Sequence, residues 1–332
     1  MENTRDAELV KHYTAPKGWR SWSTRKKFLA ASLVLLVVAV GIGLGVGLGT
    51  RHRRGHEEGS NPTSGGNTTA GNTTASWQPA VASTWQIELI TKFNDSAIDV
   101  SFANGTSGLV DVYDIDLFYT DVETISKIHD SGRKVICYFS AGSYENWRPD
   151  KDKFLPSDLG NVLNGWPNEK WLKLSSANVR NIMLSRLDMA SNKSCDGVDP
   201  DNVDGYDNNN GLGLTKEDSV DYLNFLADAA HSRGMSIGLK NANGILGHVM
   251  DQMQWSVNEQ CAQFQECPSY DAFIKAGKPV FHIEYPKGTD PDDNNNALVT
   301  GDQKDSACNF DDSSNFSTVI KNLNLDLWIE TC

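Results

Sequence analysis

The sequence predicts a single (β/α)8 barrel, the TIM-barrel class of α/β fold, over residues 85–332. Three observations support this prediction. The segment is about 250 residues long, which is the typical size of such a barrel. Strand-like apolar runs alternate along it with amphipathic helical stretches, as in chains that form a parallel sheet. Polar residues gather at the C-terminal ends of most runs, and in a barrel these ends share one face.

Eight strand-like runs are recognised by β-branched and aromatic residues between turn-forming residues. Right-handed crossovers between eight such units would close the sheet. In order, the runs cover residues 85–89, 112–118, 134–140, 197–202, 236–240, 255–259, 280–285 and 325–329.

Three helices have start signals of their own. A capping box at residues 120–123 predicts a helix that ends at Gly132, and another at residues 215–218 predicts a helix that ends before Gly234. A third amphipathic stripe follows Ser176. These helices fall between predicted strands, as the barrel requires.

An apolar stretch at residues 28–49, from Phe28 to Gly49, contains no charged residue and is long enough to cross the ~30 Å hydrocarbon layer as a helix. A cleaved signal peptide would have a shorter apolar core, so we predict an uncleaved transmembrane signal anchor. Residues 1–27 carry seven Lys/Arg against three Asp/Glu, which predicts a cytoplasmic tail. Glycines four residues apart near the end of the stretch offer a face for weak dimerisation.

Residues 50–84 are rich in Gly, Ser, Thr, Asn and Pro, so we predict a disordered, glycosylated stalk. All six cysteines follow the apolar stretch, as expected of a domain in an oxidising compartment. We therefore expect a single-pass type II protein of the plasma membrane with its folded domain outside the cell. Six N-x-S/T sequons also follow the apolar stretch, at Asn67, Asn72, Asn94, Asn104, Asn192 and Asn315.

The formal net charge of -13 is unevenly distributed. Residues 59–332 carry 20 Lys/Arg and 38 Asp/Glu, a net charge of -18. Such a surface repels nucleic acid and would attract a cationic ligand. Ordinary solubility accounts equally well for the charge taken alone.

The densest group of carboxylates lies at residues 197–206, Gly-Val-Asp-Pro-Asp-Asn-Val-Asp-Gly-Tyr. Crowded carboxylates raise one another's pKa, so such a cluster usually serves a cation, a solvated loop or a reaction. A calcium loop that starts at Asp199 would need an acid at its twelfth position, where Asn210 stands. With no H-E-x-x-H, C-x-x-C or G-x-S-x-G motif either, we expect no metal, no cofactor and no acyl transfer. Carboxylate chemistry of the kind used in glycoside hydrolysis remains.

The chain resembles glycoside hydrolase family 114, the endo-α-1,4-polygalactosaminidases, and in particular membrane-anchored fungal members that act on galactosaminogalactan. The resembling segments occur in order over the whole of residues 85–332. They are Val-Tyr-Asp-Ile-Asp-Leu-Phe at 112–118, Val-Ile-Cys-Tyr-Phe-Ser-Ala-Gly at 135–142, the cluster at 197–206, Gly-Leu-Lys-Asn at 238–241, Val-Asn-Glu-Gln-Cys at 257–261 and His-Ile-Glu-Tyr at 282–285.

The resemblance implies a retaining mechanism with two carboxylates, Asp201 as nucleophile and Glu259 as general acid and then base. Their predicted strands are the fourth and the sixth, with one strand between them. This arrangement is compatible with the separation of about 5 Å that retention requires. A negative Asp201 is expected to keep Glu259 protonated. Two alternatives stay open: Asp199 or Asp204 as the nucleophile, and Glu259 as a structural partner of Lys240.

Polar residues near the other predicted strand ends are interpreted as sugar-binding residues, with strand-end hydrogen bonding as the alternative for each. Asp116 and Glu284 are the best candidates to hold a substrate ammonium. Trp147 and Trp166 either stack on sugar faces or pack. The full set is Asp114, Asp116, Tyr138, Asn202, Asp204, Tyr206, Lys240, Gln260, Glu284 and Tyr285.

Six cysteines allow fifteen pairings if all are bridged. A buried free thiol at Cys137 is the alternative to full pairing. We expect the pairs Cys261–Cys267, Cys308–Cys332 and Cys137–Cys195.

The expected function is therefore that of a retaining, endo-acting glycoside hydrolase whose partner is a cationic polysaccharide of α-1,4-linked galactosamine. Two other functions fit the same layout. One is a non-catalytic carbohydrate-binding barrel, and the other is a glycan-processing glycosidase of the Golgi.

Overall fold

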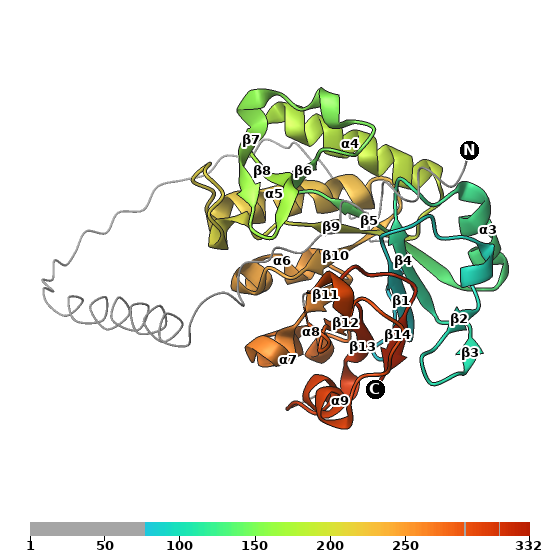
Figure 1. Cartoon of the computed structure of the whole chain (residues 1–332). Coiled ribbons are helices and arrows are strands. Elements are labelled where there is room, and N and C mark those ends of the chain that lie inside the picture. The colour runs from blue at the N-terminus through green and yellow to red at the C-terminus, as the bar shows by residue number, and fades with distance from the viewer. Residues whose placement is uncertain (1–76, 289, 312) are drawn as a thin grey trace, which may run out of the picture. The chain divides into compact units, whose positions relative to one another are not determined.

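The computed structural model describes residues 77–332, except residues 289 and 312 (Figure 1). The predicted cytoplasmic tail, the predicted membrane anchor and residues 50–76 of the predicted stalk lie outside the described residues. Within the described residues, no helix is both long and apolar enough to cross a membrane.

Eight parallel strands form a nearly closed, TIM-like barrel, which confirms the predicted α/β barrel class (Figure 1). Each strand pairs with the next parallel strand along the chain, and a short strand β14 (Ile329–Thr331) pairs antiparallel with the last. The parallel strands are β1 (Trp85–Glu88), β4 (Val112–Asp116), β5 (Lys134–Ser140), β9 (Gly197–Asp201), β10 (Ser236–Lys240), β11 (Trp255–Glu259), β12 (Val280–Glu284) and β13 (Ser317–Lys321).

The prediction of the eighth strand at residues 325–329 is wrong, because β13 lies earlier in the chain. Leu325 has a φ of 52°, which a strand residue does not adopt. This loop instead fills the gap between β13 and β1. Its Leu325 carbonyl accepts a hydrogen bond from the Leu89 amide at 3.0 Å, and its Leu327 carbonyl accepts one from Gln86 Nε2 at 3.1 Å.

Helices cover the outside of the sheet (Figure 1). No α-helix joins β1 to β4, because a hairpin of β2 (Val100–Ser101) and β3 (Ser107–Gly108) takes its place. The barrel therefore departs from one helix per strand. The helices are α3 (Val122–Asp130), α4 (Ala177–Asn192), α5 (Lys216–His231), α6 (Leu246–Val249), α7 (Cys261–Phe264), α8 (Cys267–Lys275) and α9 (Gly301–Cys308).

Two of the three predicted helix starts are confirmed. Ser176 caps α4, and Thr215 and Asp218 form a capping box on α5. The capping box predicted at Thr120 is wrong, because α3 starts one residue later with Asp121 as its N-cap and no side-chain cap bond. The Thr120 amide instead donates to the carbonyl of the last β4 residue, which ties Thr120 to the preceding turn.

Residues 77–84, predicted as the end of the stalk, belong to the folded part. Trp77 packs against Trp255 with ring centroids 5.5 Å apart, and its carbonyl accepts a hydrogen bond from Ser236 Oγ. Gln78 Nε2 donates to the Gly277 carbonyl at 3.1 Å. The predicted boundary at residue 85 is therefore too late, because a large aromatic side chain in this segment packs on the barrel.

All three predicted disulfides are present, so the alternative of a free thiol at Cys137 is wrong. They are Cys137–Cys195, Cys261–Cys267 and Cys308–Cys332.

A three-stranded antiparallel sheet is inserted between β5 and α4. It consists of β6 (Ser143–Glu145), β7 (Leu159–Leu163) and β8 (Trp166–Leu172). Because it follows the C-terminal end of β5 directly, it lies beside the end of the barrel to which the strands point.

Gly142 connects β5 to this insertion and packs against the end of β9. A Cβ atom at Gly142 would lie 1.7 Å from the Asn202 carbonyl oxygen. The Gly142 amide donates to the Asp201 carbonyl at 3.0 Å. Only glycine therefore lets the two strand ends approach this closely.

We predict that Gly142→Ala lowers the free energy of unfolding by about 2 kcal/mol or more, because the methyl group forces two backbone segments apart. Gly108→Ala is the control, since a methyl group there meets nothing within 4 Å. Urea denaturation of both variants measures the difference. Equal midpoints for the two variants would contradict the proposed close contact.

Candidate active site

The last residue of every parallel strand carries a polar side chain. These strand ends share the mouth of the barrel, where active sites of barrel enzymes are found. Glu88 and Lys321 had not been singled out from the sequence, the latter because β13 was misplaced. The eight residues are Glu88, Asp116, Ser140, Asp201, Lys240, Glu259, Glu284 and Lys321.

A cavity of about 130 Å³ opens at this mouth. Six residues predicted for the site line it: Tyr138, Asp201, Asn202, Asp204, Lys240 and Glu259. The insertion and the loops add Leu89, Glu145, Trp166, Glu169, Asn241, Leu323 and Leu325 to the lining.

Three consecutive strands are each followed directly by a residue with left-handed backbone conformation. Asn202 after β9, Asn241 after β10 and Gln260 after β11 have φ values of 59°, 49° and 65°. This conformation is costly for residues other than glycine and is least so for asparagine. It turns the chain away at once, so the last strand residue, such as Asp201 or Glu259, keeps its side chain at the mouth.

Asp201 is fixed through both carboxylate oxygens. Its Oδ1 accepts a hydrogen bond from the Asn202 amide at 2.7 Å, and its Oδ2 accepts one from the Tyr138 hydroxyl at 2.9 Å. Its side chain is 16% exposed, so a sugar in the cavity can reach it.

Glu259 is held by two neighbours. Tyr285 donates its hydroxyl proton to Oε1, and Asn241 Nδ2 donates to Oε2 at 3.0 Å. Asn241 Oδ1 in turn accepts from the Glu259 amide at 2.9 Å. Asn241, the left-handed residue after β10, therefore orients the carboxylate of Glu259 at the end of β11.

Lys240 joins the two carboxylates. Its Nζ lies 3.7 Å from Asp201 Oδ2 and 3.5 Å from Glu259 Oε2, and its side chain is 1% exposed. The two facing oxygens can be no farther apart than these distances combined, about 7.2 Å. This upper limit is compatible with the separation of about 5 Å found in retaining glycosidases.

Charge at this centre favours the ionised form of Glu259. Burial raises the pKa of Glu259, but the Lys240 ammonium and the hydrogen bonds from Tyr285 and Asn241 outweigh it and hold the pKa below its usual value. Burial also lowers the pKa of Lys240, yet Asp201 and Glu259 raise it well above normal, so the ammonium stays charged. The expectation that Asp201 keeps Glu259 protonated is therefore wrong for the free protein.

Asp114 and Asp199 form a buried layer beneath these residues. Neither has exposed surface, and neither lines the cavity. Burial raises the pKa of Asp199 to about 7 against the opposing charge of Lys240, and burial and the charge of Asp199 raise the pKa of Asp114. We infer that the two carboxyl groups share a proton, and that Asp199 is poorly placed to attack a sugar.

Asp204 remains an alternative catalytic carboxyl because it lines the cavity. Burial and the charge of Asp201 raise its pKa to about 6. Asp116, by contrast, is fully buried and pairs with Arg148 at 2.7 Å. The prediction that Asp116 holds a substrate ammonium is wrong, because its charge is already neutralised below the mouth.

The remaining predicted site residues lie around the cavity rather than in it. Tyr206 packs beside Lys216, whose Nζ lies 5.5 Å from its ring centre. Gln260 donates to Gln263 Oε1 at 2.6 Å. Glu284 accepts hydrogen bonds from two backbone amides of α7, at Ala262 and Gln263.

Glu169 and Glu145 line the cavity and were missed in the sequence. They lie on the inserted sheet, where the polar segment around residue 169 gives no clear strand pattern. Burial raises the pKa of Glu169 to about 8, and the neighbouring charge of Glu145 adds to the effect. Trp147 contacts the Arg148 guanidinium, whereas Trp166 lines the cavity.

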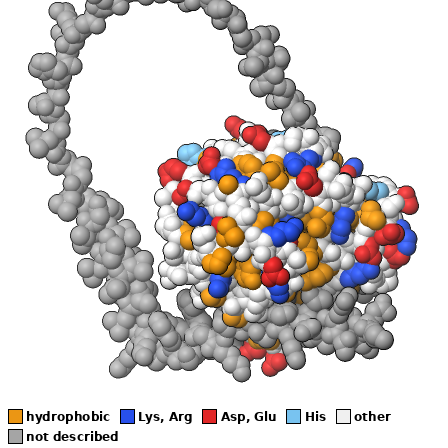
Figure 2. All heavy atoms as spheres, turned by 90° about the horizontal axis from the view of Figure 1, so that it is seen from above, with side chains coloured by type: hydrophobic (Ala, Val, Ile, Leu, Met, Phe, Trp, Pro, Cys, Tyr) orange, Lys and Arg blue, Asp and Glu red, His pale blue; other side chains and the backbone are white. Residues whose placement is uncertain are grey.

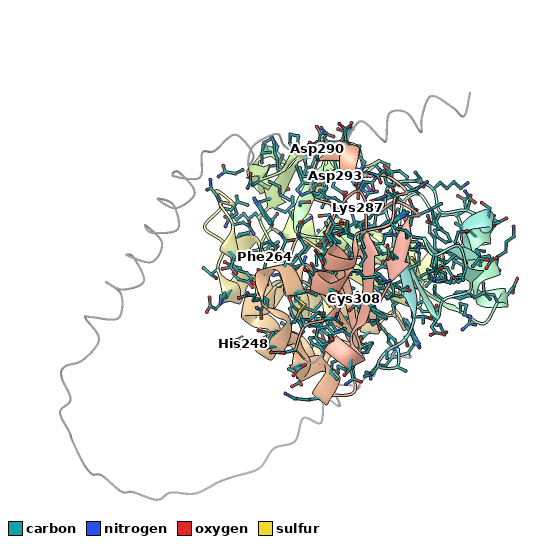
Figure 3. The ribbon with its side chains drawn as sticks, turned by 60° about the horizontal axis from the view of Figure 1, so that its bottom comes forward. His248, Phe264, Lys287, Asp290, Asp293 and Cys308 are labelled. Carbon is teal, nitrogen blue, oxygen red and sulfur yellow. A yellow bond between two sulfur atoms is a disulfide. The ribbon has the colours of Figure 1, made fainter. Side chains whose placement is uncertain are left out.

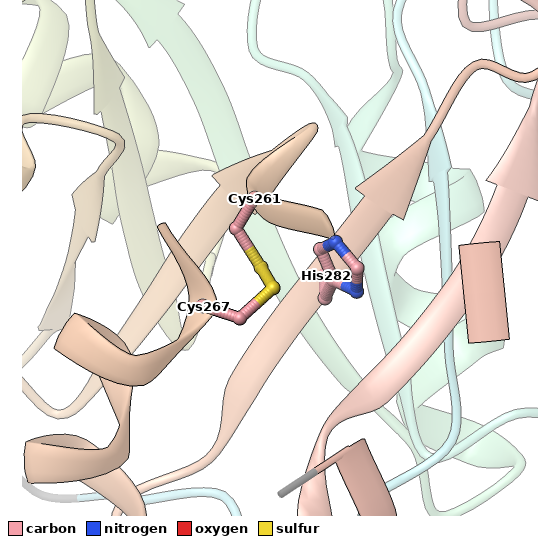
Figure 4. Close-up of side chains that lie close together, drawn as sticks. All are labelled: Cys261, Cys267 and His282. Atoms are coloured by element: carbon pink, nitrogen blue, oxygen red, sulfur yellow. A yellow bond between two sulfur atoms is a disulfide. The ribbon is translucent and has the colours of Figure 1, made fainter. Parts of the chain in front are cut away.

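Cys261 of α7, Cys267 of α8 and His282 of β12 lie close together and were tested as a metal site (Figure 4). The two sulfur atoms are bonded to each other and so offer no thiolate. His282 contacts Glu284 Oε1 at 2.9 Å and Thr318 Oγ1 at 3.0 Å through its ring nitrogens. This group braces α7, which begins two residues after Glu259.

One face of the described part carries charged side chains of both signs. On the face of the described part that Figure 2 shows, Lys and Arg side chains are scattered among acidic and apolar ones.

Glycoside hydrolases typically use two adjacent carboxylates for catalysis, and two adjacent carboxylates lie at the mouth of this parallel barrel. The model of glycoside hydrolase family GH114 matches residues 66–332, so the chain belongs to this family and is a glycoside hydrolase.

Solved structures agree with this assignment. The crystal structure of Ega3 from Aspergillus fumigatus in complex with galactosamine has 62% sequence identity and a TM-score of 0.73, covering 80% of this chain and 100% of the other. The glycoside hydrolase domain of PelA from Pseudomonas aeruginosa shares the fold, at 13% identity and a TM-score of 0.53, covering 73% of this chain and 96% of the other. No curated protein sequence matches the chain.

The raised pKa of Glu169 predicts a pH-dependent stability. In the unfolded chain Glu169 loses its proton near its ordinary pKa of 4.5, whereas the folded protein keeps it up to about 8. The folded state therefore binds more protons between these values, and stability falls as the pH rises through this window. Glu169→Gln removes this loss, so its stability relative to the parent should increase by about 1–3 kcal/mol between pH 5 and pH 8.

Urea denaturation at pH 5 and pH 8 measures this difference. Glu123→Gln, at an exposed position of α3, is the control and should show no pH-dependent difference. A constant difference between Glu169→Gln and the parent at both pH values would contradict the raised pKa.

Proposed function

We propose that this protein is a retaining, endo-acting glycoside hydrolase that cleaves α-1,4-linked galactosamine polymers such as deacetylated galactosaminogalactan. The observation that carries the proposal is Lys240, whose Nζ lies within 3.7 Å of both Asp201 and Glu259 at an open cavity. Asp201 is the nucleophile, and Glu259 is the general acid and base.

In the first step Glu259 donates a proton to the glycosidic oxygen while an Asp201 oxygen bonds to the anomeric carbon. The bond to the leaving sugar breaks, and an ester to Asp201 forms. In the second step Glu259 takes a proton from water, the water oxygen bonds to the anomeric carbon, and Asp201 is released. Tyr138, which donates to Asp201, holds the carboxylate in place through both steps.

The lowered pKa of Glu259 fits this cycle when the substrate is included. Burial is the largest influence and raises the pKa, and a sugar that covers the cavity removes water and strengthens it. Glu259 can then carry the proton that the first step needs. Once Asp201 is esterified its charge is gone, so the pKa of Glu259 falls again and favours its action as a base.

An amino sugar is favoured by the charge of the cavity. Asp204 lines the cavity in addition to the proposed catalytic pair, and Lys240 is the one Lys or Arg among the lining residues, so the three carboxylates outnumber the ammonium when they are ionised. The galactosamine bound by the Ega3 relative supports the same class of substrate. A non-catalytic barrel is disfavoured, because such a protein would have no need of a fixed pair of exposed carboxylates.

We expect the full-length protein to release oligomers from deacetylated polymer and none from fully acetylated polymer. Asp201→Asn and Glu259→Gln should each lower the rate by about 10³-fold or more, because both carboxylates act in one catalytic unit. Reducing-end assays measure the rates. Asp305→Asn, an exposed change in α9 away from the cavity, is the control. Near-normal hydrolysis by either catalytic variant would remove that residue from the mechanism.

Chemical rescue separates the two roles. With an aryl α-galactosaminide and added azide, Asp201→Gly should yield the β-glycosyl azide, because azide enters from the side that Asp201 leaves. Glu259→Ala should yield the α-glycosyl azide, because azide attacks the ester. Nuclear magnetic resonance distinguishes the products. Exchanged configurations would exchange the roles, and the absence of both azides would overturn retention.

The predicted anchor at residues 28–49 makes this enzyme a single-pass type II protein of the plasma membrane that faces the cell exterior. The three disulfides fit an oxidising compartment. The sequons at Asn94, Asn104, Asn192 and Asn315 are all exposed and open to glycosylation.

Antibody against a C-terminal tag should therefore label intact cells, and removal of N-glycans should lower the protein's mass. Asn104→Gln should lower the mass by one glycan. Labelling confined to an internal compartment of permeabilised cells would instead favour the Golgi alternative.

A further inference from the structure

A second cavity, of about 430 Å³, lies next to the catalytic one on the far side of Tyr285. Tyr285 lines this cavity and donates its hydroxyl proton to Glu259, so the two cavities are neighbours. A volume above about 300 Å³ is usual for a small-molecule site. The lining residues are Gln263, Glu284, Tyr285, Pro286, Gly288, Asp302, Gln303, Ser306 and Ala307.

The lining is acidic. It contains two carboxylates, Glu284 and Asp302, and none of its residues is Lys or Arg. Glu284 is 4% exposed, and its Oε1 accepts hydrogen bonds from the Ala262 amide at 2.8 Å and from His282. Among the described residues no hydrogen bond to its Oε2 is found, which leaves this oxygen for the cavity.

The nearest lysines are engaged elsewhere. Lys287 Nζ donates to the Asn295 carbonyl at 2.6 Å and lies over the Trp328 ring, and Lys304 pairs with Glu330 at 3.2 Å. Figure 3 shows Lys287 on the segment after β12 together with the acidic side chains of Asp290 and Asp293. The charges of Asp326, Glu330 and Asp293 also act on Lys287, so neighbouring carboxylates oppose its positive charge.

An endo-acting enzyme needs space for more than one sugar unit. The cavity around Asp201 and Glu259 measures about 130 Å³, too little for several units of a polymer. Contacts to sugars remote from the cleaved bond supply binding energy that the chemical step can use. The cavity beyond Tyr285 is the adjacent space in which such a unit fits.

We propose that the cavity between Tyr285 and α9 is a subsite for a further galactosamine unit, whose ammonium group is held by Glu284 and Asp302. Gln263 and Ser306 supply neutral groups for its hydroxyls. The proposal rests on the proposed function and adds the place where a free amine is selected. An N-acetyl group would remove the charge that Glu284 compensates, so an acetylated unit binds here more weakly.

The test compares full-length parent, Glu284→Gln and Asp302→Asn on galactosamine oligomers of increasing length. Glutamine keeps an oxygen for the α7 amides and replaces the other carboxylate oxygen by an NH2 group. We expect kcat/KM on long oligomers to fall about tenfold or more in each variant, as for loss of a charged hydrogen bond. The loss should be smaller on oligomers too short to pass Tyr285.

Asp305→Asn, on the same helix and outside the cavity, is the matched control and should retain the parent's dependence on length. Asp302 is exposed, so Asp302→Asn provides a variant whose folding is not at risk. An unchanged kcat/KM, or a loss that is equal at every length, overturns the subsite while the hydrolase function stands. A parent protein that cleaves no galactosamine oligomer overturns both.

Discussion

Lys240 balances a concentration of negative charge that the barrel could not otherwise bury. Its ammonium lies within 3.9 Å of Asp199, Asp201 and Glu259, and it is itself almost fully buried. Each buried carboxylate without a partner would cost several kcal/mol, and removing one member of such a group leaves the others uncompensated. The ammonium therefore stabilises the fold and also brings the two carboxylates that we propose as catalytic to one cavity. The same charge can then steady the ionised forms that the reaction passes through.

The backbone at the strand ends fixes the positions of these charged side chains. The left-handed residues Asn202, Asn241 and Gln260 each follow a strand without a connecting turn, so the preceding side chains stay at the mouth. Asn241 also holds Glu259 directly, because it accepts a hydrogen bond from the Glu259 amide and donates one to the Glu259 carboxylate. Backbone strain of about 1–3 kcal/mol at each such residue is tolerated where the surrounding contacts over-determine the conformation. Gly142 permits the closest of these contacts, against the end of β9.

Seven of the eight parallel strands could be predicted from the sequence, because most are buried apolar runs with a polar last residue and β9 carries the dense carboxylate cluster. β13 could not, since only Val319 and Ile320 of its five residues are apolar, while the more apolar residues at 325–329 belong to a loop. Asp201 and Glu259 were proposed as the catalytic pair from the family resemblance, and the order of their strands brings both residues to the same mouth. Glu169 was not proposed, because a tertiary contact of the inserted sheet places it there. Asp116 was misread for the same reason: only the fold reveals its pairing with Arg148.

Under the proposed function, the two cavities bind the substrate amine differently, and their charges explain why. In the catalytic cavity the carboxylates surround an internal ammonium, so a substrate amine there competes with Lys240 for the same oxygens. Beyond Tyr285 no lysine or arginine lines the surface, and a substrate amine meets Glu284 without competition. Selection of free amines should therefore be stronger at a distance from the cleaved bond than next to it. Tyr285 links the two places, because the residue that borders the outer cavity also holds the Glu259 carboxylate. A sugar that moved Tyr285 would weaken this hydrogen bond, raise the pKa of Glu259 and so favour the protonated acid that cleavage needs.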